Sequence, residues 1–129
     1  MAVTYSSSVK DARMTAVRDA IDAGGAAGKL EIGTAGMASI LATITLGYSG
    51  ASTGTVSGGV LTLAGFPRSD TSADNTGVAA AARIRTSANV DVVTGLTVST
   101  SGADINLDNT SINATQTVTI NSATITHAA

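Results

Sequence analysis

The sequence predicts a mainly β protein, an antiparallel β-sandwich or roll with one N-terminal α-helix packed on the sheet. Apolar residues recur at every second position in short bursts, such as Ile105 with Leu107 and Val118 with Ile120. This alternation places the apolar side chains on one face of a strand. Clusters of Gly, Ser, Asn and Asp separate the bursts, as is typical of turns. Only residues 9–23 have a strong helical pattern, and 129 residues fit a single domain.

The predicted helix follows an extended arm, residues 1–7, and the rest of the chain, residues 8–129, forms the domain. Ser8 and Asp11 have the spacing of a helix-start signal, and Gly24 with Gly25 is a typical helix end. The helix is amphipathic, so its apolar side should cover the sheet. That side consists of a stripe of Val9, Ala12, Ala16 and Ala20, with Met14, Val17 and Ile21 beside it.

The strands are predicted from alternation and from the turns between them. Gly58 and Gly59 lie between two β-rich runs, which indicates a tight hairpin. Residues 66–77 form the longest polar loop, in which Phe66 should pack at the edge of the core. The expected strands are residues 29–34, 39–46, the two arms of the hairpin within 55–63, 78–85, 90–94, 96–100 and three short strands after residue 101.

Composition excludes several classes of function. Charged residues make up 12% of the chain, about half the usual share of ~25%. A formal net charge of −2 and the lack of any Lys/Arg cluster argue against nucleic-acid binding. The chain has no cysteine, no apolar run near the ~18 residues of a membrane span, and no signal-peptide pattern.

The core should be filled by Val, Ile, Leu and many Ala side chains, because aromatic residues make up only 2% of the chain. Small side chains bury little area each, at about 25 cal/mol per Å². We therefore expect a monomer of modest stability and an assembly, a homo-oligomer or larger, that completes the burial.

The motifs that could carry chemistry are all incomplete. Asp104, Asn106 and Asp108 match the start of a calcium loop, but Asn109 stands where that loop needs Gly and Thr115 where it needs Glu. We expect these residues to belong to a strand instead.

Two further motifs fail as well. The run from Gly24 to Leu30 lacks the spacing and the Ser/Thr of a phosphate loop, and a helix precedes it instead of following it. His127 is the single histidine and lies near the end of the chain, which suits no catalytic triad. We therefore predict that the chain is not an enzyme and has no cofactor, metal or small-molecule substrate.

A sugar-binding module is also disfavoured, because few aromatic rings are available to stack on a sugar: Tyr5, Tyr48 and Phe66.

Several runs of the sequence resemble small structural proteins encoded by tailed bacteriophages. They are Ser69-Asp-Thr-Ser-Ala-Asp-Asn-Thr-Gly77, the strand that ends in Arg83-Ile-Arg85, Gly95-Leu-Thr-Val-Ser-Thr-Ser-Gly-Ala-Asp-Ile-Asn-Leu107 and Val118-Thr-Ile-Asn-Ser-Ala-Thr-Ile-Thr126. The N-terminal helix and the strand with Leu30 and Ile32 also fit. The chain departs from that pattern at Ala81-Ala82 and Ala88-Asn89, where an aromatic pair and an Asp-Gly turn are expected.

The resemblance implies a component of the virion, assembled in the host cytoplasm. We expect a capsid decoration (cement) protein on the capsid surface, which binds the major capsid protein, stabilises the shell and forms a homotrimer. The alternative is a tail, neck or fibre component. Two segments are predicted to contact the partner: the arm, with Ala2, Val3, Thr4 and Tyr5, and the polar loop, with Arg68, Asp70, Asp74 and Asn75.

Overall fold

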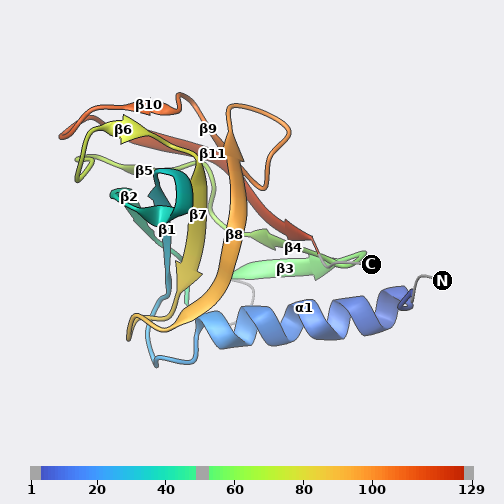
Figure 1. Cartoon of the computed structure of the whole chain (residues 1–129). Helices are drawn as coiled ribbons and strands as arrows, with labels where there is room; N and C mark the ends of the chain where they lie inside the picture. The colour runs from blue at the N-terminus through green and yellow to red at the C-terminus, as the bar shows by residue number, and fades with distance from the viewer. Residues whose placement is uncertain (1–3, 49–52, 127–129) are drawn as a thin grey trace.

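The computed structural model describes residues 4–48 and 53–126, and it confirms the predicted fold class: a curled, mainly β sheet with one N-terminal helix (Figure 1). The helix is α1 (Ser7–Ile21), and a 3₁₀ turn, η1 (Ala35–Met37), follows the first strand. The strands are β1 (Lys29–Gly33), β2 (Ile40–Thr45), β3 (Gly54–Ser57), β4 (Val60–Leu63), β5 (Arg68–Asp70), β6 (Gly77–Val78), β7 (Ala81–Arg85), β8 (Asp91–Ser99), β9 (Ile105–Leu107), β10 (Ser111–Ile112) and β11 (Val118–Thr126).

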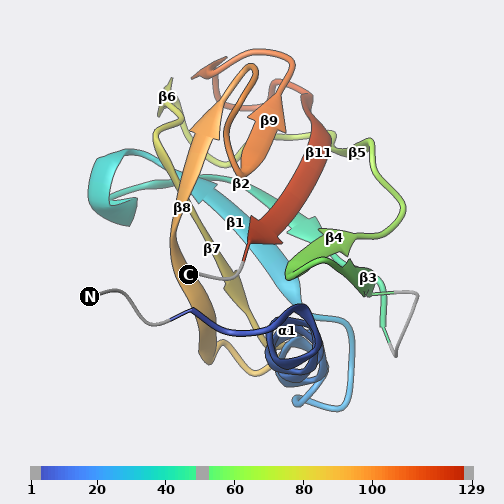
Figure 2. The same cartoon turned by 90° about the vertical axis from the view of Figure 1, so that its right-hand side faces the viewer.

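The main sheet runs in the order β2-β1-β7-β8-β9-β11-β4-β3, and β5 joins β11 outside this path. Its pairings are antiparallel except for β8 with β9, which run parallel. The prediction of a purely antiparallel sheet is therefore wrong at that one pair. The sheet curls until β2, at one end, comes back towards β5 (Figures 1 and 2).

The helix begins two residues earlier than predicted and ends two residues earlier. Ser6, and not Ser8, is the N-cap: its hydroxyl accepts a hydrogen bond from the backbone N–H of Val9, as a capping serine does. Three consecutive serines could each serve as the cap, so the sequence left the choice open. Ile21 is the last helical residue and is fully buried, and Asp22 caps the end.

The buried side of α1 also differs from the predicted stripe. Met14 and Ile21 are buried and Val17 packs beside them, whereas Val9, Ala12 and Ala16 are exposed. α1 contacts β3, β4 and β8 (Figure 2). The long side chains fill the space under the curled sheet better than the alanines, so they decide which side of the helix is buried.

Strand β11 carries two pairs of buried residues that are separated by polar residues. Val118 and Ile120 point inwards, and so do Ala123 and Ile125, although the alternation shifts by one residue between the two pairs. The pairing of β11 with β9 is irregular between Ile120 and Ser122, as expected for a β-bulge. The bulge flips the parity of the strand and keeps both halves facing the core.

The hairpin at Gly58 and Gly59 is confirmed, since β3 pairs with β4 and both glycines have positive φ, 60° and 77°. The two strands predicted for residues 90–94 and 96–100 are one continuous strand, β8 (Asp91–Ser99). Gly95 has φ 74°, where the pairing with β7 is irregular, so it marks a bulge within the strand.

Two other segments differ from the prediction. The polar loop at residues 66–77 contains the short strand β5, which pairs with β11, and Phe66 packs against the core as expected. The strand predicted for residues 78–85 is split into β6, which pairs with β10, and β7, which pairs with β1 and β8.

Candidate contact face

Three neighbouring strands gather a cluster of charged side chains on one face of the sheet. The strand registers place Glu31 of β1 opposite Arg83 of β7, Lys29 of β1 opposite Arg85 of β7, and Arg85 opposite Asp91 of β8. Directly paired residues project on the same side of a sheet. The chain has seven Lys/Arg and nine Asp/Glu residues, so five of its sixteen charged side chains form this contact face: Lys29, Glu31, Arg83, Arg85 and Asp91.

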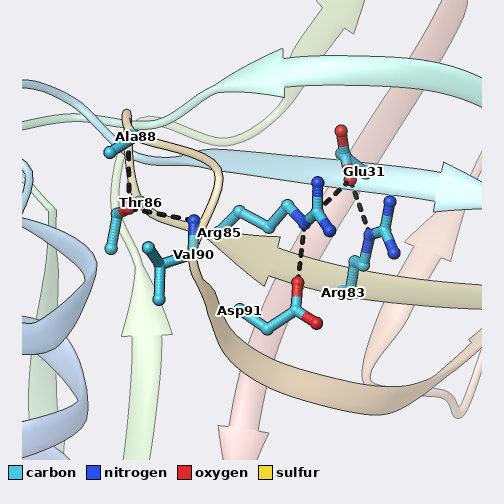
Figure 3. A network of polar contacts seen from close by, with 7 residues as sticks. All are labelled: Glu31, Arg83, Arg85, Thr86, Ala88, Val90 and Asp91. Carbon is cyan, nitrogen blue, oxygen red and sulfur yellow. Dashed lines mark hydrogen bonds and ion pairs between the residues drawn. The ribbon is translucent and has the colours of Figure 1, made fainter.

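Four of the five side chains of the contact face, all except Lys29, form a chain of ion pairs (Figure 3). The Arg83 Nε donates to the Glu31 Oε1 at 2.6 Å, and the Arg85 Nε lies 3.7 Å from the same oxygen. The Arg85 Nε also donates to the Asp91 Oδ1 at 2.6 Å. The side chain of Glu31 is only 11% exposed, so the two guanidinium groups supply the charge partners that a nearly buried carboxylate requires.

The turn between β7 and β8 fixes one end of this face. The Thr86 hydroxyl accepts hydrogen bonds from the backbone N–H groups of Ala88 and Val90, both at 3.2 Å (Figure 3). Asn89 takes positive φ at the tip of the turn, which asparagine tolerates better than most residues. Val90 lies in this turn directly before Asp91 and is 60% exposed.

Four residues of the polar loop were predicted to contact the partner, and in the structure all four bind the free edge of β2. They are Arg68, Asp70, Asp74 and Asn75. The Asp70 Oδ2 accepts from the backbone N–H of Thr43 at 3.0 Å, and the Arg68 Nη1 donates to the carbonyl oxygen of Thr45 at 3.0 Å. Further along, the backbone N–H of Asp74 donates to the Leu41 carbonyl oxygen at 2.7 Å, and the Asn75 Nδ2 donates to the Ile40 carbonyl oxygen at 2.8 Å. Free strand edges invite pairing with other chains, and this segment covers one.

A hollow of about 390 Å³ lies between residues 68–71 of the polar loop and residues 43–45 of β2. It is lined by hydroxyl-bearing side chains together with Arg68, Asp70 and Ile44. We call it the seam, and its lining is formed by residues 43–45 and 68–71. Among the residues that the structure describes, Arg68 donates to the carbonyl oxygens of Ala64 and Thr45, and Asp70 accepts from the backbone N–H groups of Thr43 and Ser72.

The predicted arm is only partly described. Ala2 and Val3 lie outside the described residues, and Thr4 and Tyr5 are exposed. The guanidinium of Arg13 lies 4.7 Å from the centre of the Tyr5 ring, which is a cation–π distance. The structure does not bring the arm and the polar loop together, since α1 starts on the side of the molecule opposite β2 and β5 (Figure 1).

The incomplete calcium pattern belongs to strand structure. The Asp104 Oδ2 accepts from the backbone N–H and the hydroxyl of Thr97, both at 3.1 Å, and Asn106 bonds to Ala103 and Ser122. Ile105 and Leu107 point into the core as predicted. Within residues 4–48 and 53–126, no group of His, Cys, Asp and Glu side chains could hold a metal ion. His127 lies outside the described residues.

Sequence reasoning missed the contact face. Its signal was present, because Lys29 with Glu31 and Arg83 with Arg85 are charged pairs at strand spacing in a chain that is poor in charge. What the sequence could not show is that β1 pairs with β7, which brings together residues about fifty positions apart.

In the described part of the chain, α1 is neither long nor apolar enough to cross a membrane. No protein-family model, curated protein sequence or solved structure matches the chain.

The bond between Asp70 of the polar loop and β2 gives a testable prediction about stability. Asp70→Ala removes the acceptor of the Thr43 N–H, and we expect a loss of about 1–2 kcal/mol, because a hydrogen bond to a charged group contributes roughly 1.5–3 kcal/mol and this one is partly exposed. Urea unfolding measures the loss, and hydrogen exchange of the Thr43 amide should become faster.

Asp74→Ala is the matched control, since Asp74 bonds to β2 through its backbone and its exposed side chain makes no bond to that strand. It should change the free energy of unfolding by less than about 0.5 kcal/mol. Equal losses in both variants would show that the Asp70 carboxylate does not hold the segment on β2.

Proposed function

We propose that this chain is a structural protein of a tailed-phage virion that decorates the outside of the capsid and binds the major capsid protein. The observation that carries the proposal is the contact face, which gathers five of the sixteen charged side chains on three neighbouring strands. The proposal also draws on the resemblance of the sequence to structural proteins of tailed phages.

The chemistry of the contact face suits a protein partner. It carries three cations and two anions, and ion pairs fix the positions of all of them except Lys29 before binding, so little side-chain freedom is lost when a partner docks. Mixed charges at an interface contribute specificity and register more than affinity.

Lys29 is the residue of this face best suited to a test. It is half-buried between its strand neighbours Thr45 and Arg85, and it forms no ion pair within residues 4–48 and 53–126. Its charge is therefore free to meet a carboxylate of the partner.

The test is co-sedimentation of the purified protein with intact capsids and, separately, with isolated tails of the phage that encodes it. We expect saturable binding to capsids at a stoichiometry of hundreds of copies, with Lys29→Glu weakening it at least tenfold. Lys10→Glu is the control, because it makes the same charge change on α1, away from the contact face. Binding to tails alone would favour the tail, neck or fibre reading, and binding to neither particle would overturn the proposal.

A further inference from the structure

The contact face and the rest of the chain carry net charges of opposite sign. The face holds three of the seven Lys/Arg side chains and two of the nine Asp/Glu side chains, so its own net charge is +1. The other charged side chains of the sequence carry a net charge of −3. A positive patch on a negative molecule attracts an anionic surface to that patch and orients it there.

The two arginines of the contact face use only part of their capacity to donate hydrogen bonds. Arg83 bonds to Glu31 and Arg85 bonds to Asp91, in both cases through Nε. Among the residues that the structure describes, the Nη1 and Nη2 groups of the two arginines donate no hydrogen bond. The side chains are 21% and 24% exposed, so solvent reaches them. A guanidinium presents its donors as a planar fork that matches a carboxylate, and these Nη groups are available to one.

The two guanidinium groups lie side by side. The Nε atoms of Arg83 and Arg85 lie 2.6 Å and 3.7 Å from the same oxygen atom, Oε1 of Glu31 (Figure 3). One carboxylate thus faces two full positive charges, and Lys29 adds a third on the neighbouring strand. On the β2 side the directly paired residues are uncharged threonines, which supply no further anion. The face therefore has positive charge left for a partner.

Asp91 is the part of this cluster that an incoming anion can most easily displace. The side chain of Asp91 is 47% exposed, whereas that of Glu31 is 11% exposed. Exposed ion pairs contribute only about 0–1 kcal/mol, because water screens the two charges. A carboxylate of a partner would compete with Asp91 for Arg85 and would be repelled by its charge. Removing the charge of Asp91 should therefore strengthen the binding of an anion.

The charge and spacing of the contact face suit carboxylates better than phosphate. A phosphate group carries a charge of about −1.5 to −2 at pH 7, which Glu31 and Asp91 would repel more strongly than the single charge of a carboxylate. Arg83 and Arg85 stand at alternate positions of β7. Acidic residues at alternate positions of an extended segment have the same spacing, roughly 6.6 Å.

We propose that the contact face binds an acidic segment of the capsid protein, whose carboxylates accept hydrogen bonds from the Nη groups of Arg83 and Arg85 and from the Nζ of Lys29. Asp91 lies at the edge of this site and lowers its affinity by charge repulsion. The inference rests on the proposed function for the identity of the partner, and it adds the chemistry by which that partner is recognised.

The first test uses hexaglutamate as the probe and follows the arginine Nε–Hε signals of the full chain by NMR. We expect saturable shifts at Arg83 and Arg85, and much smaller shifts at Arg13, which lies on α1 away from the contact face. Equal shifts at Arg13, or no shift at the two arginines of the contact face, would overturn the inference. Inorganic phosphate is the second titrant, and tighter binding of phosphate than of hexaglutamate would refute the choice of an acidic segment.

Three variants separate recognition of an anion from a merely structural role of the ion pairs. Arg85→Gln should weaken the binding of hexaglutamate at least fivefold, and Asp91→Asn should tighten it about threefold, because it removes a like charge at the site. Asp19→Asn makes the same charge change on α1, where the side chain is 67% exposed, and should leave the affinity nearly unchanged. Weaker binding by Asp91→Asn would show that the ion pairs only maintain the fold, and would contradict the inference.

Co-sedimentation with capsids in the presence of hexaglutamate distinguishes the inference from the proposed function. We expect hexaglutamate to displace the protein from capsids. Capsid binding that hexaglutamate leaves unchanged would overturn the inference and leave decoration of the capsid in place. Binding of hexaglutamate at the contact face without any binding to capsids would overturn the proposed function and with it the capsid protein as partner, while the acidic-segment site itself would stand.

Discussion

Replacing Arg83 with alanine is expected to lower the free energy of unfolding by about 3 kcal/mol. The Glu31 carboxylate would lose its 2.6 Å hydrogen bond while its side chain stays 11% exposed. Removing one partner of a buried ion pair costs about 3–5 kcal/mol, since a charge is left without compensation. The lower end of that range applies, because Arg85 remains 3.7 Å from the same carboxylate. Urea unfolding at pH 7 gives the value.

A double-mutant cycle separates the ion pair from the packing of the long side chains. Glu31→Leu with Arg83→Leu removes both charges, and we expect this double variant to be more stable than Arg83→Leu alone by at least 1 kcal/mol. Additive losses in the two single variants would contradict the account of Glu31 as a carboxylate held by its partners.

Ile120→Ala should lower the free energy of unfolding by about 4 kcal/mol, within the range of roughly 2–5 kcal/mol for a large buried aliphatic residue. Ile120 is fully buried and pairs with Arg68 of β5 on one side and Leu107 of β9 on the other. It therefore joins three strands just before the bulge in β11. Val78→Ala is the control, since this side chain is 62% exposed and should contribute less than about 0.5 kcal/mol. Equal losses in the two variants would contradict the position of Ile120 in the core.

Local pattern was enough to predict most of the elements. Alternation identified β1, β2 and β9, and Gly58 with Gly59 identified the hairpin of β3 and β4, because these signals depend on neighbours in sequence. The helix was found but displaced by two residues, since a run of three serines offers three caps of similar quality.

Features that depend on distant residues could not be read in the same way. The parallel pairing of β8 with β9 and the ion pairs of the contact face follow from strand order, and strand order leaves no local signal. The polar loop shows the same limit. Arg68 and Asp70 were singled out as polar residues of an exposed loop, and the structure shows that they bind the edge of β2, which the loop reaches only when the sheet curls.

The measurement that tests the central claim most directly is the copy number of this chain per virion, determined by quantitative mass spectrometry against the major capsid protein. Decoration of the capsid predicts hundreds of copies, at a ratio to the capsid protein near one or another simple fraction. A handful of copies per particle would place the chain in the neck, tail or fibre, and its absence from purified virions would contradict a structural role in the particle.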